Sequence, residues 1–379
     1  MAQPVRRPLG RSDQVCVTGA TGFIGSAIAR ALLDRGCAVR AVVEPAIDRT
    51  NIEKLDVEVV EADVRDADAV GRALAGVAVV FHTAALYRFW ARQRRLFYEV
   101  NVGGTRNVLT AAGASRCGVV YTSTVGTIGL RPDGTPADED DVTEIEHLFG
   151  SYKRSKYVAE HEALRHAAAG LPVVITHPTF PLGQGDRAPT PTGQLVVDFL
   201  NGRIPAYVDT ALNVVDVDDV AEGHILAAER GGSGRSYVLG GENMELVEVL
   251  RVLAEHTGLP RPRGKIPAPA ALAVGRASEL VQGRLLRRAP AVPFEAARMS
   301  TTRMVFDDSR ARRELGYTSG PAADAIRRSA DWYLAEGYVR PQRVARLSRA
   351  PRGDGRPGRP AREDGRPGPG KVDRGHGSP

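Results

Sequence analysis

The stretch from Val15 to Gly25, VCVTGATGFIG, decides the fold of this chain. A short Val-rich run leads into three glycines, and an amphipathic pattern, FIGSAIARALLDRG, follows at once. Between a strand and a helix, glycines permit a tight turn, let the backbone approach a pyrophosphate and place a helix N-terminus beside it. The stretch therefore predicts a dinucleotide site in which the contact residues are Gly19, Thr21, Gly22, Phe23, Ile24 and Gly25.

The alternation of Val-rich runs and helical patterns continues along the chain. Five further runs are predicted strands with the nearly continuous apolar character of strands covered on both faces: AVRAVV, VEVVEADV, VAVVFHTAA, GVVYTST and LPVVITHP. We expect an α/β fold in which residues 14–178 form a Rossmann-type doubly wound parallel sheet that binds NAD(P). Beyond Pro178 the sequence becomes rich in Pro, Gly and Thr, so residues 179–340 are predicted to form a smaller α/β substrate-binding lobe.

The composition is that of a soluble globular protein. Apolar residues make up 42% of the 379 residues and charged residues 25%, and no apolar run approaches the ~18 residues that span a bilayer. The cysteines Cys16, Cys37 and Cys117 form no CxxC pair, which favours small buried packing residues, a reducing compartment and no metal site. Residues 1–13 are a predicted flexible extension without the apolar run of a secretory signal, so we expect a cytoplasmic protein.

The net charge of +6 is concentrated at the C-terminal end. Residues 341–379 hold ten Arg or Lys against four Asp or Glu, so the rest of the chain is neutral overall and has no footprint typical of nucleic-acid binding. Gly and Pro make up 15 of these 39 residues, which predicts a disordered basic tail. The tail is either merely solvated or able to touch an anionic lipid or nucleic-acid surface.

The choice between NAD and NADP depends on the end of the second predicted strand. Glu44 stands there, where a carboxylate accepts the ribose hydroxyls and repels a 2′-phosphate, so the sequence favours NAD. Arg40 and Arg49 are close enough in sequence to accept that phosphate instead. Asp63 ends the third strand, where it either meets the adenine amine or caps the next helix, and Val64 would pack beside the adenine ring.

The chemistry is predicted to lie in SYKRSKYVAE, which opens a helix ending near Gly170. Tyr152 and Lys156 are four residues apart and therefore share one helix face. An ammonium within ~4–6 Å stabilises a phenolate, so Lys156 is expected to lower the pKa of Tyr152 and to hold the nicotinamide ribose. A third group should come from GVVYTSTVGTIG, where Ser123, Thr124 and Thr127 are available.

TGATGFIG, the TST segment and YKRSK together resemble the extended short-chain dehydrogenase/reductase superfamily, including its NAD-dependent epimerase/dehydratase family, over roughly residues 14–338. Within it the chain resembles the hopanoid-associated sugar epimerases, themselves close to dihydroflavonol reductases. The segments that carry this narrower likeness are YRFWARQRRLFYEVNVGGTRN, LRPDGTPADE, APTPTGQLVVDFLNGRIPAYVD and LGGEN.

The resemblance implies roles for further positions. Thr124 falls at the catalytic Ser/Thr position, and homodimers are the habit of the family. Two positions depart from these relatives: Glu44 replaces an Arg that usually holds NADP, and Asp216 replaces a common His. The positions implied to lie against the cofactor are His82, Thr83, Ala84, Ala85, Asn101, Ser123, Pro178 and Thr179.

Substrate contacts are predicted from an aromatic cluster and two loops. Aromatic rings followed by Arg can stack a sugar or base and bind an anion, although the cluster could equally be a hydrophobic lid or a dimer contact. The residues concerned are Tyr87, Phe89, Trp90, Thr124, Arg187, Tyr207 and Asp209.

Three functions are compatible with these residues. An epimerase removes a hydride from a sugar and returns it to the other face, whereas a ketone reductase of the dihydroflavonol reductase type receives a ketone and releases an alcohol. The same Tyr, Lys and Thr serve both reactions, and the resemblance favours the sugar epimerase. A dinucleotide-sensing scaffold without catalysis is the third hypothesis, although such a protein is expected to lose the Tyr or the Lys.

Overall fold

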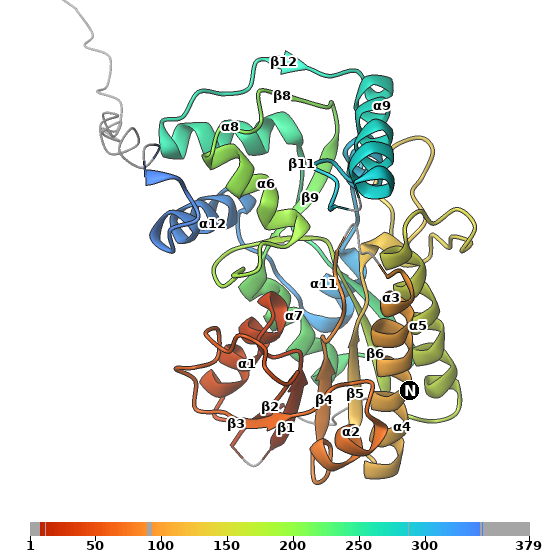
Figure 1. Cartoon of the computed structure of the whole chain (residues 1–379). Helices are drawn as coiled ribbons and strands as arrows, with labels where there is room; N and C mark the ends of the chain where they lie inside the picture. The colour runs from red at the N-terminus through yellow and green to blue at the C-terminus, as the bar shows by residue number, and fades with distance from the viewer. Residues whose placement is uncertain (1–7, 12, 89–92, 287, 342, 344–379) are drawn as a thin grey trace, which may run out of the picture.

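A seven-stranded parallel sheet forms the larger part of the molecule in the computed structural model (Figure 1). The structure describes residues 8–11, 13–88, 93–286, 288–341 and 343, so the predicted tail from residue 344 onward lies outside the described residues. The strand order is β10-β6-β5-β4-β1-β2-β3, and every neighbouring pair is parallel. The strands are β1 Gln14–Thr18, β2 Ala38–Val43, β3 Glu58–Glu61, β4 Val79–His82, β5 Gly118–Thr122, β6 Val173–Pro178 and β10 Ser236–Leu239.

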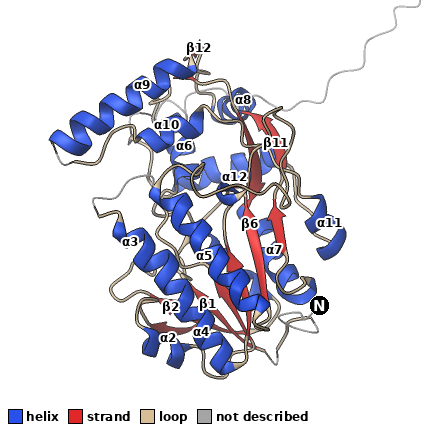
Figure 2. Cartoon of the chain, turned by 90° about the vertical axis from the view of Figure 1, so that its right-hand side faces the viewer, coloured by secondary structure: helices blue, strands red, loops and turns tan. Residues whose placement is uncertain are grey.

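Helices cover both faces of this sheet, which confirms the doubly wound prediction (Figure 2). Helices α1 (Phe23–Asp34), α7 (Val217–Arg230) and α11 (Ser309–Leu315) pack on one face, and α2 (Ala67–Ala73), α4 (Thr105–Ser115) and α5 (Ser151–Ala168) pack on the other. Each face has its own apolar core, because the alternating Val and Ile side chains of buried parallel strands point to opposite sides. The three cysteines are buried in these layers as thiols.

The division of the chain differs from the boundary expected at Pro178. Strand β10 extends the large sheet beside β6, and α7 packs against α1, so the chain returns to the sheet after it has begun the second lobe. Strand β10 pairs with β6 along its whole length and so becomes the edge strand of the sheet. The expectation that residues 1–13 form a flexible extension is also wrong for Leu9. This residue is buried in the core, and its N–H donates to Glu229.

The second lobe lies above the carboxyl ends of the large sheet (Figure 1). Its three-stranded sheet contains β7 (Phe180–Leu182), β9 (Ala211–Asp216) and β11 (Glu242–Glu245). Helices α6 (Pro191–Leu200), α8 (Leu246–Thr257) and α12 (Ala322–Ala335) bury their apolar faces in a third core beside it. A parallel pair, β8 (Ala206–Tyr207) with β12 (Gly264–Lys265), completes its sheets.

The remaining elements are short or irregular helices, and most were not expected from the sequence. Helix α3 (Arg95–Tyr98) leads into the π-helix η1 (Glu99–Gly104), and the 3₁₀ turn η2 (Val125–Thr127) follows β5. In the second lobe, α9 (Ala268–Ser278) continues as the π-helix η3 (Glu279–Leu285), and α10 (Phe294–Ser300) packs against α9.

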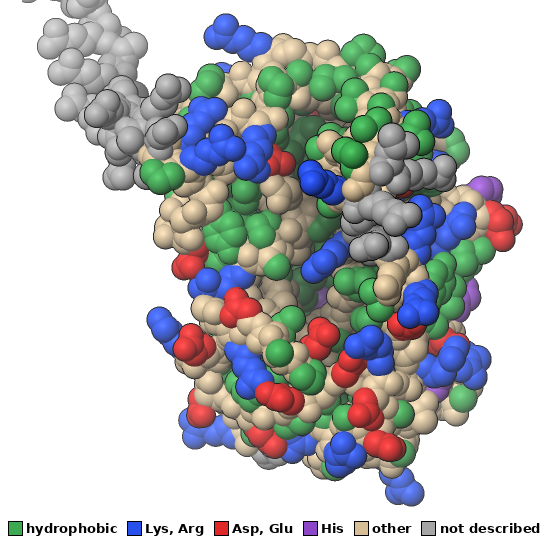
Figure 3. Space-filling view, in the orientation of Figure 1, with side chains coloured by type: hydrophobic (Ala, Val, Ile, Leu, Met, Phe, Trp, Pro, Cys, Tyr) green, Lys and Arg blue, Asp and Glu red, His purple; other side chains and the backbone are tan. Residues whose placement is uncertain are grey.

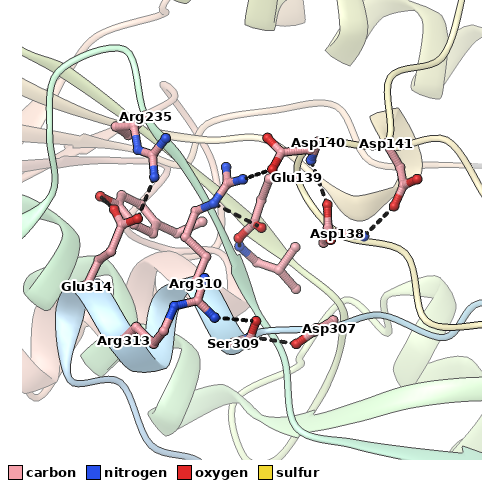
Figure 4. Close-up of polar contacts among 12 residues, drawn as sticks. Asp138, Glu139, Asp140, Asp141, Arg235, Asp307, Ser309, Arg310, Arg313 and Glu314 are labelled. Atoms are coloured by element: carbon pink, nitrogen blue, oxygen red, sulfur yellow. Dashed lines mark hydrogen bonds and ion pairs between the residues drawn. The ribbon is translucent and has the colours of Figure 1, made fainter.

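A charged cluster ties the loop after η2 to the free edge of β10 (Figure 4). The Val238 N–H of β10 donates to Glu139 over 2.6 Å, and Arg310 of α11 pairs with Glu139 at 3.5 Å and with Asp140 at 2.5 Å. The Glu139 side chain is 1% exposed, and burial raises the pKa of its carboxyl. Arg310 therefore supplies the cation for a buried carboxylate.

Removal of this cation should destabilise the fold. We expect Arg310→Ala to lower the free energy of unfolding by about 2–4 kcal/mol, because Glu139 would remain buried without a cation. The matched control is Arg313→Ala on the same helix, whose exposed side chain donates to the Ser309 hydroxyl, and it should change stability by less than about 1 kcal/mol. Urea unfolding measures both, and equal losses in the two variants would contradict the assignment.

Candidate active site

Tyr152, Lys156 and Thr124 come together where the strands of the large sheet end. Tyr152 and Lys156 lie in the first two turns of α5 and are 8% and 3% exposed, and Thr124 follows β5. Thr124 hydrogen-bonds the Tyr152 hydroxyl. The Lys156 ammonium donates to the Thr122 carbonyl over 2.6 Å and lies 4.3 Å from the centre of the Tyr121 ring.

Burial governs the acid–base properties of this group. Burial raises the pKa of Tyr152 above its ordinary value, and the hydrogen bond from Thr124 opposes the rise. Burial also lowers the pKa of Lys156 to about 7, against the opposing charge of Glu160. The Lys156 ammonium is directed to the Thr122 carbonyl and the Tyr121 ring, so its expected effect on the pKa of Tyr152 stays a prediction. With its raised pKa, Tyr152 is a protonated phenol at neutral pH.

A second polar layer lies behind these residues. Glu160, two turns along α5 from Tyr152, accepts hydrogen bonds from Ser123 over 2.5 Å and from Thr127 over 2.9 Å, and its other oxygen lies 3.5 Å from His177. His177 also contacts the Thr124 carbonyl at 3.1 Å. The Ser123 hydroxyl is thus bonded to Glu160, and the layer fixes the backbone that carries Thr124.

The glycine-rich turn has the close approach that its sequence predicts. Gly19 has a φ of +69°, and a Cβ at Gly25 would lie 2.3 Å from the Gly19 carbonyl oxygen and 2.8 Å from Thr83 Oγ1. Helix α1 begins immediately after Gly22, and no side chain caps its N-terminus. Free N–H groups at a helix N-terminus with no Cβ in front of them fit a pyrophosphate.

The residues expected around the cofactor line the same edge. Thr83 donates to the Thr18 carbonyl over 2.7 Å, and the backbone of Ala84 would lie 2.8 Å from a Cβ at Gly19. Ala85 follows in the same half-buried segment. Asn101, in η1, holds the backbone of Leu86 through its amide and the Ser155 hydroxyl of α5.

His82 has a structural position under this edge. Thr105 donates its hydroxyl proton to the Asn101 carbonyl, so His82 Nε2–H donates to Thr105 and Nδ1 accepts from Thr18. Burial lowers the pKa of His82 to about 3, and the charge of Lys156 adds to the effect. His82 is therefore a neutral link between β1, β4 and the helices below them.

The three residues expected to select NAD or NADP lie in β2 or in the segment that follows it. Glu44 is exposed directly after β2, whereas Arg40 binds Glu58 and two backbone carbonyls and Arg49 pairs with Glu61. Neither arginine is free for a 2′-phosphate. Asp63 is held by Arg65, and the helix cap that was its alternative role belongs to Asp66, so that alternative is wrong.

Thr179 supplies a further sign of a bound group. It follows β6 and Pro178, and its Oγ1 is buried without a hydrogen-bond partner among the described residues. A buried hydroxyl without a partner is costly, and a nicotinamide amide at this position would satisfy it. Val64 is buried against Gly104 at the other end of the predicted cofactor site.

A cavity of about 590 Å³ opens between the sheet edge and the second lobe, where Figure 3 shows the surface hollowed. Thr124, Tyr152 and Tyr87 lie in its wall, and the Tyr87 ring is 4.6 Å from that of Tyr152. Most of the remaining wall is apolar and comes from the second lobe, with Phe180, Leu195, Leu212, Val292, Met299 and Phe306 among its residues.

Lys153 and Glu295 are two titratable groups, each of which acts on the pKa of the other, that the sequence did not single out. Lys153 lines the cavity and its stem lies over Gly126, and burial lowers the pKa of its ammonium. Glu295 of α10 lies against Gly150, its Oε1 has no hydrogen-bond partner among the described residues, and burial raises the pKa of its carboxyl to about 7. Lys153 stands next to Tyr152 in the sequence. Glu295 is far from both in the sequence, and only the fold places it against Gly150, at the start of α5.

Several predicted substrate contacts are not brought to the cavity. Arg187 pairs with Glu336 at 3.0 Å and Asp209 with Lys265 at 3.1 Å, while Tyr207 lies in β8, and none of the three lines the cavity. These charges are satisfied by partners within the second lobe. Phe89 and Trp90 lie outside the described residues. Asp216 caps α7 and binds Arg328, so its role is structural.

Comparison with protein families identifies the group to which this architecture belongs. Residues 15–240 match the model of the NAD dependent epimerase/dehydratase family. A putative dihydroflavonol 4-reductase from Synechocystis is 40% identical over 341 residues, which cover 88% of this chain and 98% of that protein. Sterol demethylase protein B from Methylococcus capsulatus is 34% identical over 85% of this chain and 99% of that protein.

A solved structure shares both the fold and part of the sequence. A nucleoside-diphosphate-sugar epimerase from Pseudomonas aeruginosa matches with a TM-score of 0.73 and 28% identity, over 86% of this chain and 99% of that one. The match thus extends through both the sheet and the second lobe. This chain belongs to the NAD-dependent epimerase/dehydratase family, an enzyme family of the extended short-chain dehydrogenase/reductase type.

Proposed function

We propose that this protein is an NAD(H)-dependent oxidoreductase that interconverts a ketone and a secondary alcohol on a largely apolar, polycyclic or long-chain molecule. The observation that carries the proposal is the apolar cavity wall immediately in front of Tyr152 and Thr124. The relatives named as a dihydroflavonol reductase and a sterol demethylase protein support it, since both names refer to polycyclic molecules.

The residues of this chain supply the proton transfer and the positioning. The nicotinamide cofactor, when bound, supplies or accepts the hydride. In the reducing direction, the protonated Tyr152 donates its proton to the substrate oxygen as negative charge develops there, and the Thr124 hydroxyl donates a hydrogen bond to the same oxygen. The raised pKa of Tyr152 keeps it in the acid form and so favours its role in reduction.

The cofactor would lie along the sheet edge. The turn at Gly19, Gly22 and Gly25 would hold the pyrophosphate, Glu44 would accept the adenosine ribose hydroxyls, and Thr179 would bond the nicotinamide amide. Lys156 lies deeper than Tyr152 and would hold the nicotinamide ribose. Glu44, with both nearby arginines engaged elsewhere, supports NAD over NADP.

The sugar epimerase remains a prediction from the sequence. A nucleotide sugar would bring two phosphates and several hydroxyls into the cavity, and Arg88 and Lys153 are cations in its wall. The apolar majority of the wall gives such hydroxyls few partners and therefore favours the reductase. The two reactions differ in stoichiometry, because a reductase consumes one reduced cofactor per product and an epimerase consumes none.

Replacement of Tyr152 tests the mechanism. We expect Tyr152→Phe to lower kcat for ketone reduction by at least about 10²-fold, because the proton donor is lost, while NADH still binds. The control is Tyr157→Phe on the same helix, whose ring stacks on His161 and does not line the cavity. Stopped-flow or steady-state loss of NADH absorbance gives kcat, and unchanged turnover in Tyr152→Phe would refute the mechanism. A protein that binds NADH but has no turnover even as wild type would support the scaffold hypothesis.

Replacement of Glu44 tests the cofactor assignment. We expect the wild-type protein to bind NADH at least about tenfold more tightly than NADPH, and Glu44→Ala to reduce this ratio, because the carboxylate that repels the 2′-phosphate is gone. Calorimetric titration of both cofactors measures the ratio. Glu53→Ala, an exposed carboxylate on the following segment, should leave it unchanged. Equal affinities in the wild type would contradict the role of Glu44.

The buried Glu295 predicts a pH dependence of stability. Its pKa is raised in the folded protein, so the native state retains a proton that the unfolded state loses, and stability falls as pH rises from the ordinary carboxyl range through about 7. Glu295→Gln imitates the protonated form, so it should be more stable than the wild type at pH 8, by about 1–3 kcal/mol, and nearly equal at pH 4.5. Urea unfolding at both pH values measures this, and a stability difference independent of pH would contradict it.

A further inference from the structure

The helix formed by α9 and the start of η3 exposes apolar side chains to solvent. In most surface helices the apolar side chains face the protein core. One exposed face of this helix is apolar, and its residues recur at helical spacing: Ala270, Ala273, Val274, Ala277, Leu280 and Val281, here called the α9 face, with the exposed Arg276 at its border. Val274, Leu280 and Val281 are 56%, 54% and 49% exposed. Surface helices usually turn polar residues outward, and a contiguous exposed apolar stripe marks an interaction site.

The rest of the helix is fixed so that this face points outward. Gly275 is buried against α10, where a Cβ would lie 2.6 Å from that of Ala297 and 3.2 Å from the Phe294 Cα. The close contact with α10 determines the rotation of α9 about its axis. Figure 2 shows α9 projecting at the edge of the molecule, and Figure 3 shows hydrophobic side chains gathered over it.

The charge around the α9 face is predominantly positive. Residues 261–300 contain eight Arg or Lys and two Glu, although the chain before residue 341 is neutral overall. Arg261, Arg263, Arg276 and Arg288 are exposed there, and Arg276 lies over the Phe294 ring at 5.1 Å. Apolar side chains flanked by exposed arginines fit the interface of an anionic bilayer. The apolar side chains enter the acyl region, and the arginines bind the lipid phosphates.

The segment that follows the α9 face in the sequence lines the cavity. Residues 289–293, which follow η3, line the cavity, and among them Val292 is also 37% exposed. Leu286, just before this segment, is 55% exposed. Helix α10, on which α9 rests, contributes Ala296 and Met299 to the cavity wall. The exposed apolar surface is thus continuous in sequence with the apolar cavity.

We propose that the α9 face docks this protein on an anionic phospholipid bilayer and that the apolar substrate enters the cavity from that bilayer along Leu286 and residues 289–293. The docking depends only on this surface, whereas the entry of substrate rests on the proposed function. None of the described helices has the length and apolar composition to cross a membrane, so the contact is interfacial. A second copy of the chain is disfavoured as the occupant, because a symmetric contact would bring two basic segments together.

Sedimentation of the full chain with phospholipid vesicles tests the docking. The wild type should bind vesicles of phosphatidylcholine with phosphatidylglycerol, and Val274→Glu/Leu280→Glu should weaken that partition at least about tenfold, because two apolar contacts become charges repelled by the lipid. The matched control is Val59→Glu/Val142→Glu, which adds the same two charges at exposed apolar positions of the sheet domain and should stay within about twofold of the wild type.

Two results would overturn the docking proposal. The first is equal vesicle binding by the α9 variant and its control, which would assign any binding to other basic segments such as the tail. The second is a dimer of the wild type in sedimentation velocity that the α9 variant dissociates, which would assign the face to a second copy.

Activity on a small water-soluble ketone without vesicles separates this proposal from the proposed function. The α9 variant should reduce that ketone with the wild-type kcat/KM, which shows that its fold is intact. A wild type that reduces no ketone would contradict the proposed function, whereas the vesicle result would still decide the docking. The second measurement uses a ketone embedded in the vesicles. A kcat/KM of the α9 variant that is lower than that of the wild type supports entry from the bilayer, and an equal kcat/KM refutes it.

Discussion

The uniform direction of the seven strands in the large sheet is the constraint on which the rest of the structure depends. Parallel strands bring all their carboxyl ends to one edge, so the turns that follow β1, β4, β5 and β6 become neighbours although they are far apart in the sequence. The glycine-rich turn, Ala84, Thr124 and Thr179 therefore line one continuous edge. If one strand ran in the opposite direction, the turn after it would lie at the opposite edge of the sheet, and its residues would be lost from the site.

Helix α5 joins this edge to the second lobe. Tyr152, Lys156 and Glu160 recur every four residues, so one helix face carries the acid, the ammonium and the carboxylate that fixes Ser123 and Thr127. Lys153 stands beside this face, where it meets the cavity and the charge of Glu295. In the proposed mechanism the helix thus orders both the proton donor and a polar contact for the substrate.

The second lobe gives the site its apolar character. Its wall is assembled from β7, α6, β9, the segment before α10 and the residues around Met304, which no short motif contains. A nucleoside-diphosphate-sugar epimerase shares this fold through both the sheet and the second lobe. In the proposed function, the apolar wall of the lobe selects the substrate, and the sheet edge carries the proton donor.

The sequence by itself determined the sheet, its first six strands, the dinucleotide turn and the trio of Tyr152, Lys156 and Thr124, because these depend on local periodicity and on motifs a few residues long. It also identified Glu44, because the second predicted strand ends there, about 20 residues after the glycine-rich turn. Only the tertiary structure decided that Arg187 and Asp209 have partners elsewhere, that Lys156 turns to Thr122, that Glu295 lies against Gly150, and that the α9 face is exposed. The reason is physical: pairing, burial and the exposure of a helix face are set by contacts between segments distant in sequence, and periodicity within one segment carries no record of them.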